Sequence, residues 1–473
     1  MTPEDVHSPE EKARQINADG LVHGTFAEIG AGQEVARRFF HAGRASATIA
    51  KSISAYDMVV SDSLYGPADH YVSRTRLENM LDHEYEELVN RLGATRGLNS
   101  CLFAFADTVA THTSRRREAG HGWMGVRFQS RPGSTPSEII IHIEMLDALT
   151  VNQQDAVGRT GVNLLYAALY HRDARLLIAT LMDGLDRRRL EIDMIRFSGP
   201  AFQGVDNRLM SLHLVERGLT DAVMFTKDGE VVQPAEVLSR KPVLIERGSF
   251  RPVTNVTRDM LDRALDQLES NSPSANRAVL MEMTLNNLMS ESGIDHADFL
   301  ARADMLGALG GTVMISNYTT FDRVTQYLRN YTREQIGMVA GIPTLRQIMD
   351  EKYYSDLSGG LLEGLGRLFS GPVKLLAYPT ISPDSGAMTA VDSVEVAPHL
   401  KHLYAHLREN GFVEPICQFD TTHLHLTPSD VLSRIQSGDS SWQEMVPPAV
   451  VRMIVERRLF GYSELVAARP QTP

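Results

Sequence analysis

The sequence predicts an α/β protein with parallel, doubly wound sheets and a helical C-terminal region. Over the middle of the chain, short and continuous apolar runs alternate with segments of helical periodicity. Such runs are typical of strands that are buried on both faces of a parallel sheet. Hydrophobic residues make up 43% of the 473 residues, which suffices for the cores of two or three domains.

The first third of the chain is expected to hold a disordered tail, over residues 1–20, and an N-terminal α+β domain, over residues 21–150. The tail is polar and charged, which does not favour a packed core. Helical periodicity covers residues 33–54 and 74–92. Apolar runs then predict strands at residues 102–106, 124–128 and 139–145.

Seven more apolar runs lie between residues 192 and 377, mostly separated by helical segments. Together with residues 139–145 they make eight, so a (β/α)8 barrel remains an alternative to open sheets. The spacing of the runs is irregular, which favours open sheets. We therefore expect one α/β domain over residues 151–270, a second over residues 271–395 and a helical region over residues 396–473.

Composition narrows the partners and the location of the protein. The 47 basic and 59 acidic residues give a net charge of −12, whereas nucleic-acid and anionic-membrane binders draw most of their affinity from a basic surface. Two cysteines, Cys101 and Cys417, cannot form a disulfide framework. No apolar run approaches the roughly 18 residues of a membrane span, and the N-terminus lacks the apolar core of a signal peptide. We predict a cytoplasmic protein with no nucleic-acid or membrane partner; a homo-oligomer is left open.

The stretch Phe26–Phe40 predicts a strand, a Gly-x-Gly turn and an amphipathic helix. Gly30 and Gly32 form the turn, so backbone N–H groups at the helix start could hold an anion. Val35 stands where a dinucleotide fingerprint has its third glycine, and the acidic residue expected at the end of a second strand is missing. The stretch is therefore a candidate anion site rather than a dinucleotide site.

The predicted helix after this turn carries a basic face. Arg37, His41, Arg44 and Lys51 share one side at a periodicity of 3.6 residues. Fixed positive charges on this face could bind a phosphate or dock an acidic partner. The alternative is a solvated face that pairs with the protein's own carboxylates.

Polar residues at the ends of the predicted strands form the second candidate site. In an open α/β sheet, ligands bind outside the carboxyl ends of the strands. Asp193 and Glu282 are candidates for a general base or a metal-binding carboxylate. Arginines could clamp a phosphate or carboxylate, although small polar residues in these positions also serve in turns and caps. The candidate ligand-binding residues are Arg196, Arg247, Ser249, Arg251, Ser316 and Asn317.

Five of the 16 histidines lie between His399 and His425. His399, His402 and His406 are spaced so that they share one face of a helix. With Asp420 they could hold a divalent metal, which is the one cofactor that the sequence suggests. The spacing matches no specific metalloenzyme motif, and the alternative is a group of surface histidines.

Several blocks of the sequence resemble a known family when they are taken together. The blocks are Phe26–Phe40, Ser198–Ser211, Glu246–Val253, Ile315–Thr319 and Asp350–Tyr354. They resemble a widespread, largely uncharacterised bacterial family of similar length, and the likeness runs over most of the chain. Members often carry the name nicotinate-nucleotide or nicotinamide-nucleotide adenylyltransferase, which implies nucleotidyl transfer in NAD metabolism. The chain departs from the His-x-Gly-His motif of that enzyme class, because neither His23-Gly24 nor His121-Gly122 is followed by a second histidine.

These features together predict a cytosolic enzyme that acts on a nucleotide or another phosphorylated small molecule, and the resemblance implies a transferase. One anionic group of the ligand would lie at the Gly-x-Gly turn and the basic helix, and another at the strand-end arginines. The alternative is a non-catalytic ligand-binding or assembly protein that docks an acidic partner through the basic helix.

Overall fold

The computed structural model describes residues 8–111, 120–271, 273–274, 276–291, 293–381 and 386–463. The chain divides into two compact units, Met1–Asp221 and Ala222–Pro473, and each unit has its own sheet. Both sheets are open and contain parallel strands, so the predicted α/β class is confirmed and the barrel alternative is wrong. The finer division into domains stays a prediction.

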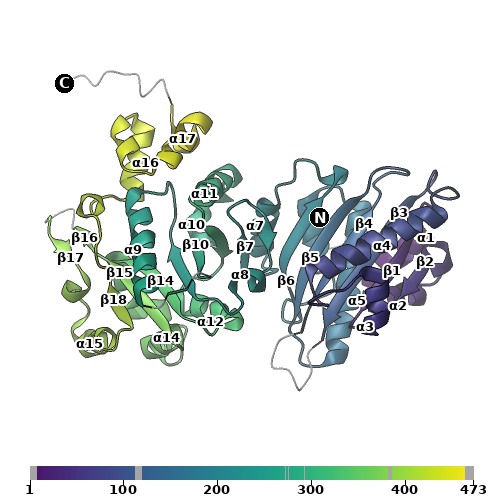
Figure 1. Ribbon diagram of the computed structural model, residues 1–473, viewed down its shortest axis with the longest axis horizontal. Helices are drawn as coiled ribbons and strands as arrows, with labels where there is room; N and C mark the ends of the chain where they lie inside the picture. Colours follow the sequence, from purple (N-terminus) through teal and green to yellow (C-terminus); the bar gives the residue numbers. More distant parts are fainter. Residues whose placement is uncertain are drawn as a thin grey trace. The chain divides into compact units, whose positions relative to one another are not determined.

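The first unit is built on a six-stranded mixed sheet. Its strands are β1 (Val22–Ile29), β2 (Ile49–Ile53), β3 (Cys101–Ala110), β4 (Gly120–Phe128), β5 (Ser137–Met145) and β6 (Leu190–Ser198). They lie in the order β2-β1-β3-β4-β5-β6 (Figure 1). Strands β2, β1 and β3 are parallel, and β3 to β6 are antiparallel.

Helices cover both faces of this sheet. They are α1 (Pro9–Ala18), α2 (Glu34–Ala42), α3 (Met58–Tyr65), α4 (Arg74–Leu92), α5 (Thr150–Tyr170), α6 (Ala174–Thr180) and α7 (Asn207–Glu216). On one face, α4 places Leu81 against Gly125 of β4. On the other, α2 and α5 approach closely where Val35 and Phe105 meet Gly161. On this face, α5 therefore packs against α2 and against β3.

The expectation of a disordered tail over residues 1–20 is wrong for residues 9–18, which form α1. The helix begins with a capping box, in which the Glu11 N–H donates to the Ser8 hydroxyl and the Ser8 N–H donates to the Glu11 carboxylate. Ala13 and Ile16 are fully buried. Tertiary packing thus stabilises a helix that could not be predicted from the polar composition of the segment.

Helix α2 ends at Ala42, although the sequence predicts a helix as far as residue 54. Gly43 and Arg44 have φ angles of +82° and +60°, which a right-handed helix does not adopt. After this break the chain enters β2, which pairs in parallel with β1. The alanines after Gly43 favour a helix by propensity, so the backbone break and the strand pairing override propensity.

The second unit is built on an eight-stranded sheet. Its strands are β7 (Ala222–Phe225), β8 (Val231–Val232), β9 (Val243–Arg247), β10 (Ala278–Thr284), β13 (Thr312–Ser316), β14 (Ile336–Gly341), β15 (Val373–Tyr378) and β18 (Val413–Pro415). They lie in the order β18-β15-β14-β9-β10-β13-β7-β8. From β18 to β13 the strands are parallel, and β7 and β8 add an antiparallel edge.

Numbered along the chain, the parallel strands of this sheet follow the order 6-5-4-1-2-3. This is the strand order of the doubly wound fold that binds dinucleotides. The order reverses between β9 and β14. Ligands of such folds bind outside the carboxyl ends of the strands, near this reversal.

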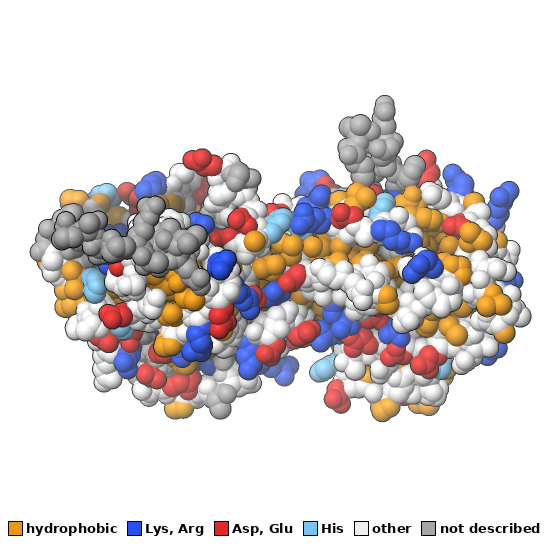
Figure 2. Space-filling view, turned by 90° about the horizontal axis from the view of Figure 1, so that it is seen from above, with side chains coloured by type: hydrophobic (Ala, Val, Ile, Leu, Met, Phe, Trp, Pro, Cys, Tyr) orange, Lys and Arg blue, Asp and Glu red, His pale blue; other side chains and the backbone are white. Residues whose placement is uncertain are grey.

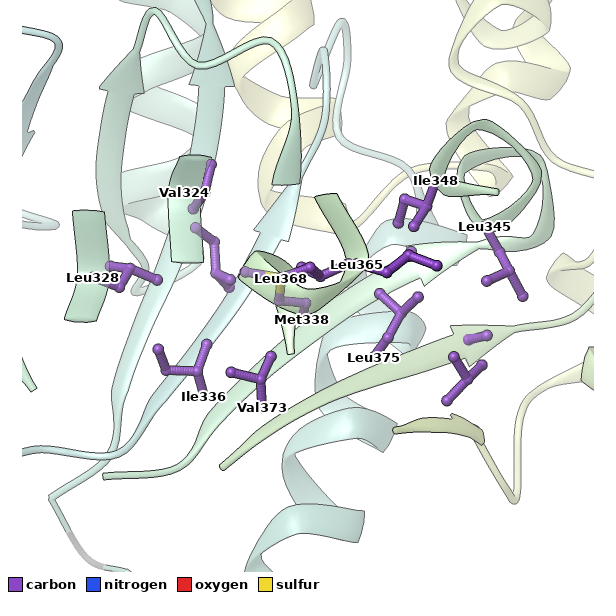
Figure 3. Packing of buried hydrophobic residues seen from close by; sticks show 14 of the residues in the cluster. Val324, Leu328, Ile336, Met338, Leu345, Ile348, Leu365, Leu368, Val373 and Leu375 are labelled. Atoms are coloured by element: carbon purple, nitrogen blue, oxygen red, sulfur yellow. The ribbon is translucent and has the colours of Figure 1, made fainter. Parts of the chain in front are cut away.

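Helices cover both faces of the second sheet as well. They are α8 (Pro234–Leu238), α9 (Asn255–Asn271), α10 (Leu285–Leu288), α11 (His296–Ala308), α12 (Phe321–Tyr331), α13 (Ile342–Ile348), α14 (Gly360–Leu368), α15 (Lys401–Glu409), α16 (Pro428–Ser437) and α17 (Pro448–Arg457). Figure 3 shows Val324 of α12 and Leu368 of α14 in one core with Met338 of β14. On the opposite face, Leu268 of α9 packs with Val339. Two short hairpins complete the unit: β11 (Met289–Ser290) with β12 (Gly293–Ile294), and β16 (Thr380–Ile381) with β17 (Met388–Thr389).

The predicted helical C-terminal region is confirmed, with one addition. β18 pairs in parallel with β15 and forms an edge of the sheet. A strand of three residues that ends in proline is too short to show the alternation that marks a strand in a sequence.

The surface carries charges of both signs. Figure 2 shows basic and acidic side chains interspersed over the face of the molecule that is in view. Among the described residues, no helix combines the length and the apolar character needed to cross a membrane.

Candidate functional site

The carboxyl ends of β9, β10 and β13 bring three predicted site residues together. Arg247 donates from Nε and Nη2 to the two carboxylate oxygens of Glu282, at 2.9 Å each. The Ser316 hydroxyl donates to the same carboxylate at 2.6 Å. Arg247 also donates from Nη1 to the carbonyl oxygen of Thr319 at 3.3 Å. Because β9, β10 and β13 are neighbours in the sheet, three side chains that are distant in sequence form one cluster.

This cluster holds the guanidinium group of Arg247 in place at the carboxyl ends of these strands. The Glu282 side chain is 0% exposed, whereas the Arg247 side chain is 12% exposed. The Phe321 ring lies 4.5 Å from the guanidinium carbon of Arg247. Glu282 already accepts hydrogen bonds from Arg247 and Ser316, so it is better placed to hold the guanidinium than to act as a general base. An arginine has five N–H donors, and the hydrogen bonds of Arg247 leave some of them for a ligand.

The loop after β9 holds two more predicted residues, but outside the cluster. Arg251 donates from Nε to Asp298 at 2.7 Å. The carbonyl oxygen of Ser249 accepts from Arg302 at 3.1 Å. Asn317, at the end of β13, is exposed. The loop is thus held by the side chains of α11, and Arg251 is engaged there.

The start of α9 is closed by the protein itself. In the doubly wound fold, the helix after the first strand usually binds the pyrophosphate of a dinucleotide. Here the Asn255 N–H donates to the carbonyl oxygen of Met445 at 2.9 Å, and its side-chain amide donates to that of Glu444 at 2.8 Å. A C-terminal segment of the chain therefore occupies two of the donors at the start of this helix.

A cavity of about 260 Å³ lies at the start of α12. Thr319, whose carbonyl oxygen accepts from Arg247, is part of its wall, so the cavity adjoins the arginine cluster. The lining residues are Thr319, Thr320, Asp322, Arg323, Lys352, Tyr353, Tyr354, Asp356 and Leu357.

In the first unit, the Gly-x-Gly turn does form between a strand and a helix, as predicted. Gly30 and Gly32 have φ angles of +107° and +90°. The helix start, however, already holds a carboxyl group of the protein. The Glu28 carboxylate accepts from the N–H groups of Val35, at 2.9 Å, and Ala36, at 2.8 Å. The donors that the sequence assigned to an external anion are therefore occupied.

Glu28 also forms one half of a buried acidic pair. It lies directly beside Asp107 on the neighbouring strand β3. Burial raises the pKa of Glu28 to about 7, against the opposing effect of the two N–H groups. Burial and the proximity of Glu28 raise the pKa of Asp107 well above its usual range. A proton kept on this pair relieves the repulsion between the two carboxyl groups.

The predicted basic face does not exist as one helical face. Arg37 pairs with Glu34 on α2 at 2.6 Å. Arg44 is exposed in the turn after the helix. Lys51 lies on β2 and pairs with Glu84. The prediction is wrong because α2 ends before Arg44 and Lys51, so that the four residues do not share one helical face. Carboxylates of the protein also pair with Arg37 and Lys51.

Asp193 is linked to His142 and, through it, to the partly exposed His121, a chain of side chains that the sequence did not reveal. His142 Nδ1 lies 2.6 Å from Asp193 Oδ1, and its Nε2 lies 3.2 Å from Nδ1 of His121. Asp193 and His142 are 3% and 1% exposed. Since they stand on neighbouring antiparallel strands, only the strand register brings them together. Arg196, also on β6, pairs instead with Glu78 of α4 at 2.7 Å.

The three histidines proposed as metal ligands lie on the surface. His399, His402 and His406 are exposed, and His399 precedes α15 rather than lying on it. His399 Nε2 lies 3.0 Å from a carboxylate oxygen of Glu351. In the part of the second unit that the structure describes, these imidazoles do not belong to a group of three converging ligand atoms. The metal site stays a prediction.

In the first unit, His83, Glu84 and Glu87 bring ligand atoms within 4.8 Å of one another. The ammonium group of Lys51 forms ion pairs with both glutamates. A fixed cation therefore already neutralises these carboxylates, and an ion-pair network accounts for the cluster.

Comparison with known proteins adds little to this geometry. No protein-family model and no curated protein matches the chain, so the adenylyltransferase name gains no support. Among solved structures, the competence/damage-inducible protein CihA from Agrobacterium tumefaciens is 20% identical over 34% of this chain and 94% of its own, with a TM-score of 0.25. The competence damage-inducible protein A from Klebsiella pneumoniae is 16% identical over 35% and 99%, with a TM-score of 0.26. A competence-damaged protein superfamily member from Escherichia coli is 14% identical over 34% and 91%, with a TM-score of 0.25. Scores this low assign neither a shared fold nor a function.

Proposed function

We propose that the chain is an enzyme that binds a nucleotide or another phosphorylated small molecule at the carboxyl edge of the second sheet. One observation carries the proposal. Arg247, at the end of the first parallel strand, is held by Glu282 and Ser316 from the next two strands and remains partly exposed. This is the region in which doubly wound sheets bind their ligands.

The chemistry of the cluster suits a phosphoryl group. A guanidinium matches the geometry of phosphate oxygens and stays charged, and its orientation is set before the ligand arrives. In a transfer reaction, Arg247 would stabilise the negative charge that develops on the phosphoryl oxygens. Glu282 would act as a positioning residue. The finer expectation, nucleotidyl transfer in NAD metabolism, is one case of this chemistry.

Thermal-shift measurements on the full chain test the proposal. The ligands are inorganic phosphate, sugar phosphates, nucleoside mono- and triphosphates, nicotinate and nicotinamide mononucleotides and NAD(P). A ligand at 100 times its Kd adds about 2.7 kcal/mol to the free energy of unfolding, which gives a clear increase in Tm. We expect at least one phosphorylated ligand to give such an increase, and Arg247→Lys to abolish it because lysine cannot reproduce the planar fork.

Arg452→Lys is the matched control, because Arg452 is exposed on α17 and the substitution is the same. It should leave the ligand-induced shift unchanged. If no phosphorylated ligand raises the Tm, or if Arg247→Lys keeps the shift, the proposal fails. The chain would then be treated as the non-catalytic binding or assembly protein.

A further inference from the structure

His142, His121 and Asp193 form a linked cluster in the first unit, where β4 begins and β5 ends. Nδ1 of His142 lies 2.6 Å from Oδ1 of Asp193, and Nε2 of His142 lies 3.2 Å from Nδ1 of His121. The side chains of His142 and Asp193 are buried, whereas His121 is partly exposed. A buried carboxylate thus contacts the first of two imidazoles, and the second imidazole reaches the surface.

The spacing of the two imidazoles fits two ligands of one metal ion. Zinc binds histidine nitrogens at about 2.0–2.1 Å in a tetrahedral arrangement, which places two such nitrogens about 3.3–3.4 Å apart. Nε2 of His142 and Nδ1 of His121 are 3.2 Å apart. An N–H···N hydrogen bond has a similar length, and three further features of the cluster favour the metal ion.

The first feature is the carboxylate on the far side of His142. Histidines that bind a metal through one nitrogen commonly donate the other N–H to a carboxylate, which orients the ring. Because an ionised carboxylate only accepts hydrogen bonds, Nδ1 of His142 is the nitrogen that donates to Asp193. In the neutral imidazole, Nε2 then has the lone pair that a metal ion needs.

The second feature is the balance of charge around Asp193. In the described part of the first unit, its ion-pair partner is His142 rather than a lysine or an arginine. Glu191, on the same strand, adds a second carboxyl group close to Asp193. Buried charges in proteins are paired or coordinate metals. A divalent cation bound to His142 would supply the positive charge that these carboxyl groups lack.

The third feature is a further ligand that strand register places on the same face. Glu144 follows His142 by two residues on β5 and lies directly opposite His121 on β4. Side chains at both kinds of position project from one face of a sheet. Among the described residues, the Glu144 carboxylate does not belong to a group of three converging ligand atoms, so it must change rotamer to reach the ion.

We propose that His121, His142 and Glu144 bind a divalent first-row metal ion, and that Asp193 positions His142. Two imidazoles and one carboxylate suit zinc. Three protein ligands leave a fourth position for water, as in catalytic rather than structural zinc sites. The proposal is independent of the proposed function, which concerns the second unit.

Zinc titration of the metal-free full chain tests the proposal. The chain is dialysed against a chelator, its fold is checked by circular dichroism, and isothermal titration calorimetry measures zinc binding. We expect His121→Ala to weaken binding by more than about 100-fold, because loss of a ligand exceeds the 10–100-fold cost of losing an outer partner. His121 is partly exposed, so this variant should fold. His41→Ala, at an exposed histidine of α2, is the matched control and should leave the affinity unchanged.

Cobalt separates a ligand from a positioning residue, because the visible absorption bands of bound Co²⁺ depend on its ligands. Glu144→Gln should change these bands. Asp193→Asn should keep the bands of the unmodified chain and weaken the metal affinity by about 10–100-fold. A purely structural role of Asp193 would instead lower the Tm of the metal-free chain and leave the affinity unchanged.

An unmodified chain that does not bind zinc would overturn the proposal. Zinc binding that His121→Ala leaves unchanged would also overturn it, because the ion would then lie elsewhere. An unchanged affinity in Asp193→Asn would refute the positioning role of Asp193. Unchanged cobalt bands in Glu144→Gln would refute Glu144 as a ligand.

Discussion

The starts of α2 and α12 differ in what satisfies them, although each helix follows the carboxyl end of a parallel strand. At α2, Glu28 of the preceding strand accepts from the first-turn N–H groups of Val35 and Ala36. At α12, no side-chain cap is present among the described residues. A Gly-x-Gly turn therefore does not by itself define an anion site, because the last residues of the preceding strand decide whether the donors remain available.

The same two regions also differ in the neighbour of a buried glutamate. Glu282 is buried against Arg247, whereas Glu28 is buried beside Asp107. The first arrangement stabilises a charge, and the second favours a proton. Four predictions, from the largest expected effect to the smallest, test these two differences between the regions.

Removing the negative charge of the ion pair should have the largest effect. Glu282→Gln leaves the largely buried guanidinium of Arg247 without its counter-charge, and breaking one side of such a pair costs about 3 kcal/mol or more. Urea denaturation at pH 7 measures the loss. Glu28→Gln is the control, and it should cost clearly less because its site favours an uncharged side chain. Equal losses for the two variants would contradict the contrast.

The acidic pair should make stability depend on pH. Since the pKa values of Glu28 and Asp107 are raised in the folded chain, the folded state binds more protons than the unfolded state between pH 4.5 and about 7. The free energy of unfolding should therefore fall as the pH rises through this window, by about 1 kcal/mol per pH unit for one proton. The stabilisation is complete below the ordinary pKa values and lost above the raised ones.

Urea denaturation at pH 5, 6, 7 and 8 gives this profile, and Asp107→Asn separates the pair from other titrating groups. The variant should have a flatter profile and gain stability relative to the unmodified chain as the pH rises. A variant profile parallel to that of the unmodified chain would show that the pair does not titrate as inferred.

Part of this contrast could be predicted from the sequence. The apolar run before Gly30 and the periodicity after it gave β1, the turn and α2. The rule that ligands bind at strand ends singled out Arg247, Glu282 and Ser316, and strand order then placed them together. These elements depend on local pattern, which a sequence shows directly.

The partners of the charged residues could not be predicted, because they depend on strand register and on contacts across the fold. Arg251 pairs with Asp298, 47 residues away. His142 contacts Asp193, which is 51 residues away and lies on the neighbouring strand. Lys51 lies on a strand rather than on the predicted helix, because the helix ends at Gly43. Only the observed φ angle of this glycine shows that the helix stops there.

The two glycines of the turn should differ in their tolerance of a side chain. A Cβ on Gly30 would lie 1.7 Å from the carbonyl oxygen of Val109, whereas a Cβ on Gly32 meets no atom closer than 3.9 Å. Both positions have positive φ angles, so each alanine variant is strained. Gly30→Ala should therefore be less stable than Gly32→Ala by about 2 kcal/mol, which is the cost of overpacking. Thermal and urea unfolding measure the difference. Equal stabilities would show that strand β3 shifts to accommodate the added methyl group.

Substitution of Arg44 should change stability least among the four predictions. It distinguishes a role of this residue in anion binding from a role in the turn. It has a φ angle of +60° and is exposed, a conformation that asparagine adopts more readily than arginine. If Arg44 serves only the turn, Arg44→Asn should raise the free energy of unfolding by about 0.5 kcal/mol. Arg240→Asn, at a φ angle of +56° in the second unit, is the matched control and should gain a similar amount. If Arg44→Asn also weakens the binding of a phosphorylated ligand while Arg240→Asn does not, then the turn after α2 binds an anion. The occupied donors at the start of α2 would then not exclude an anion site at the other end of that helix.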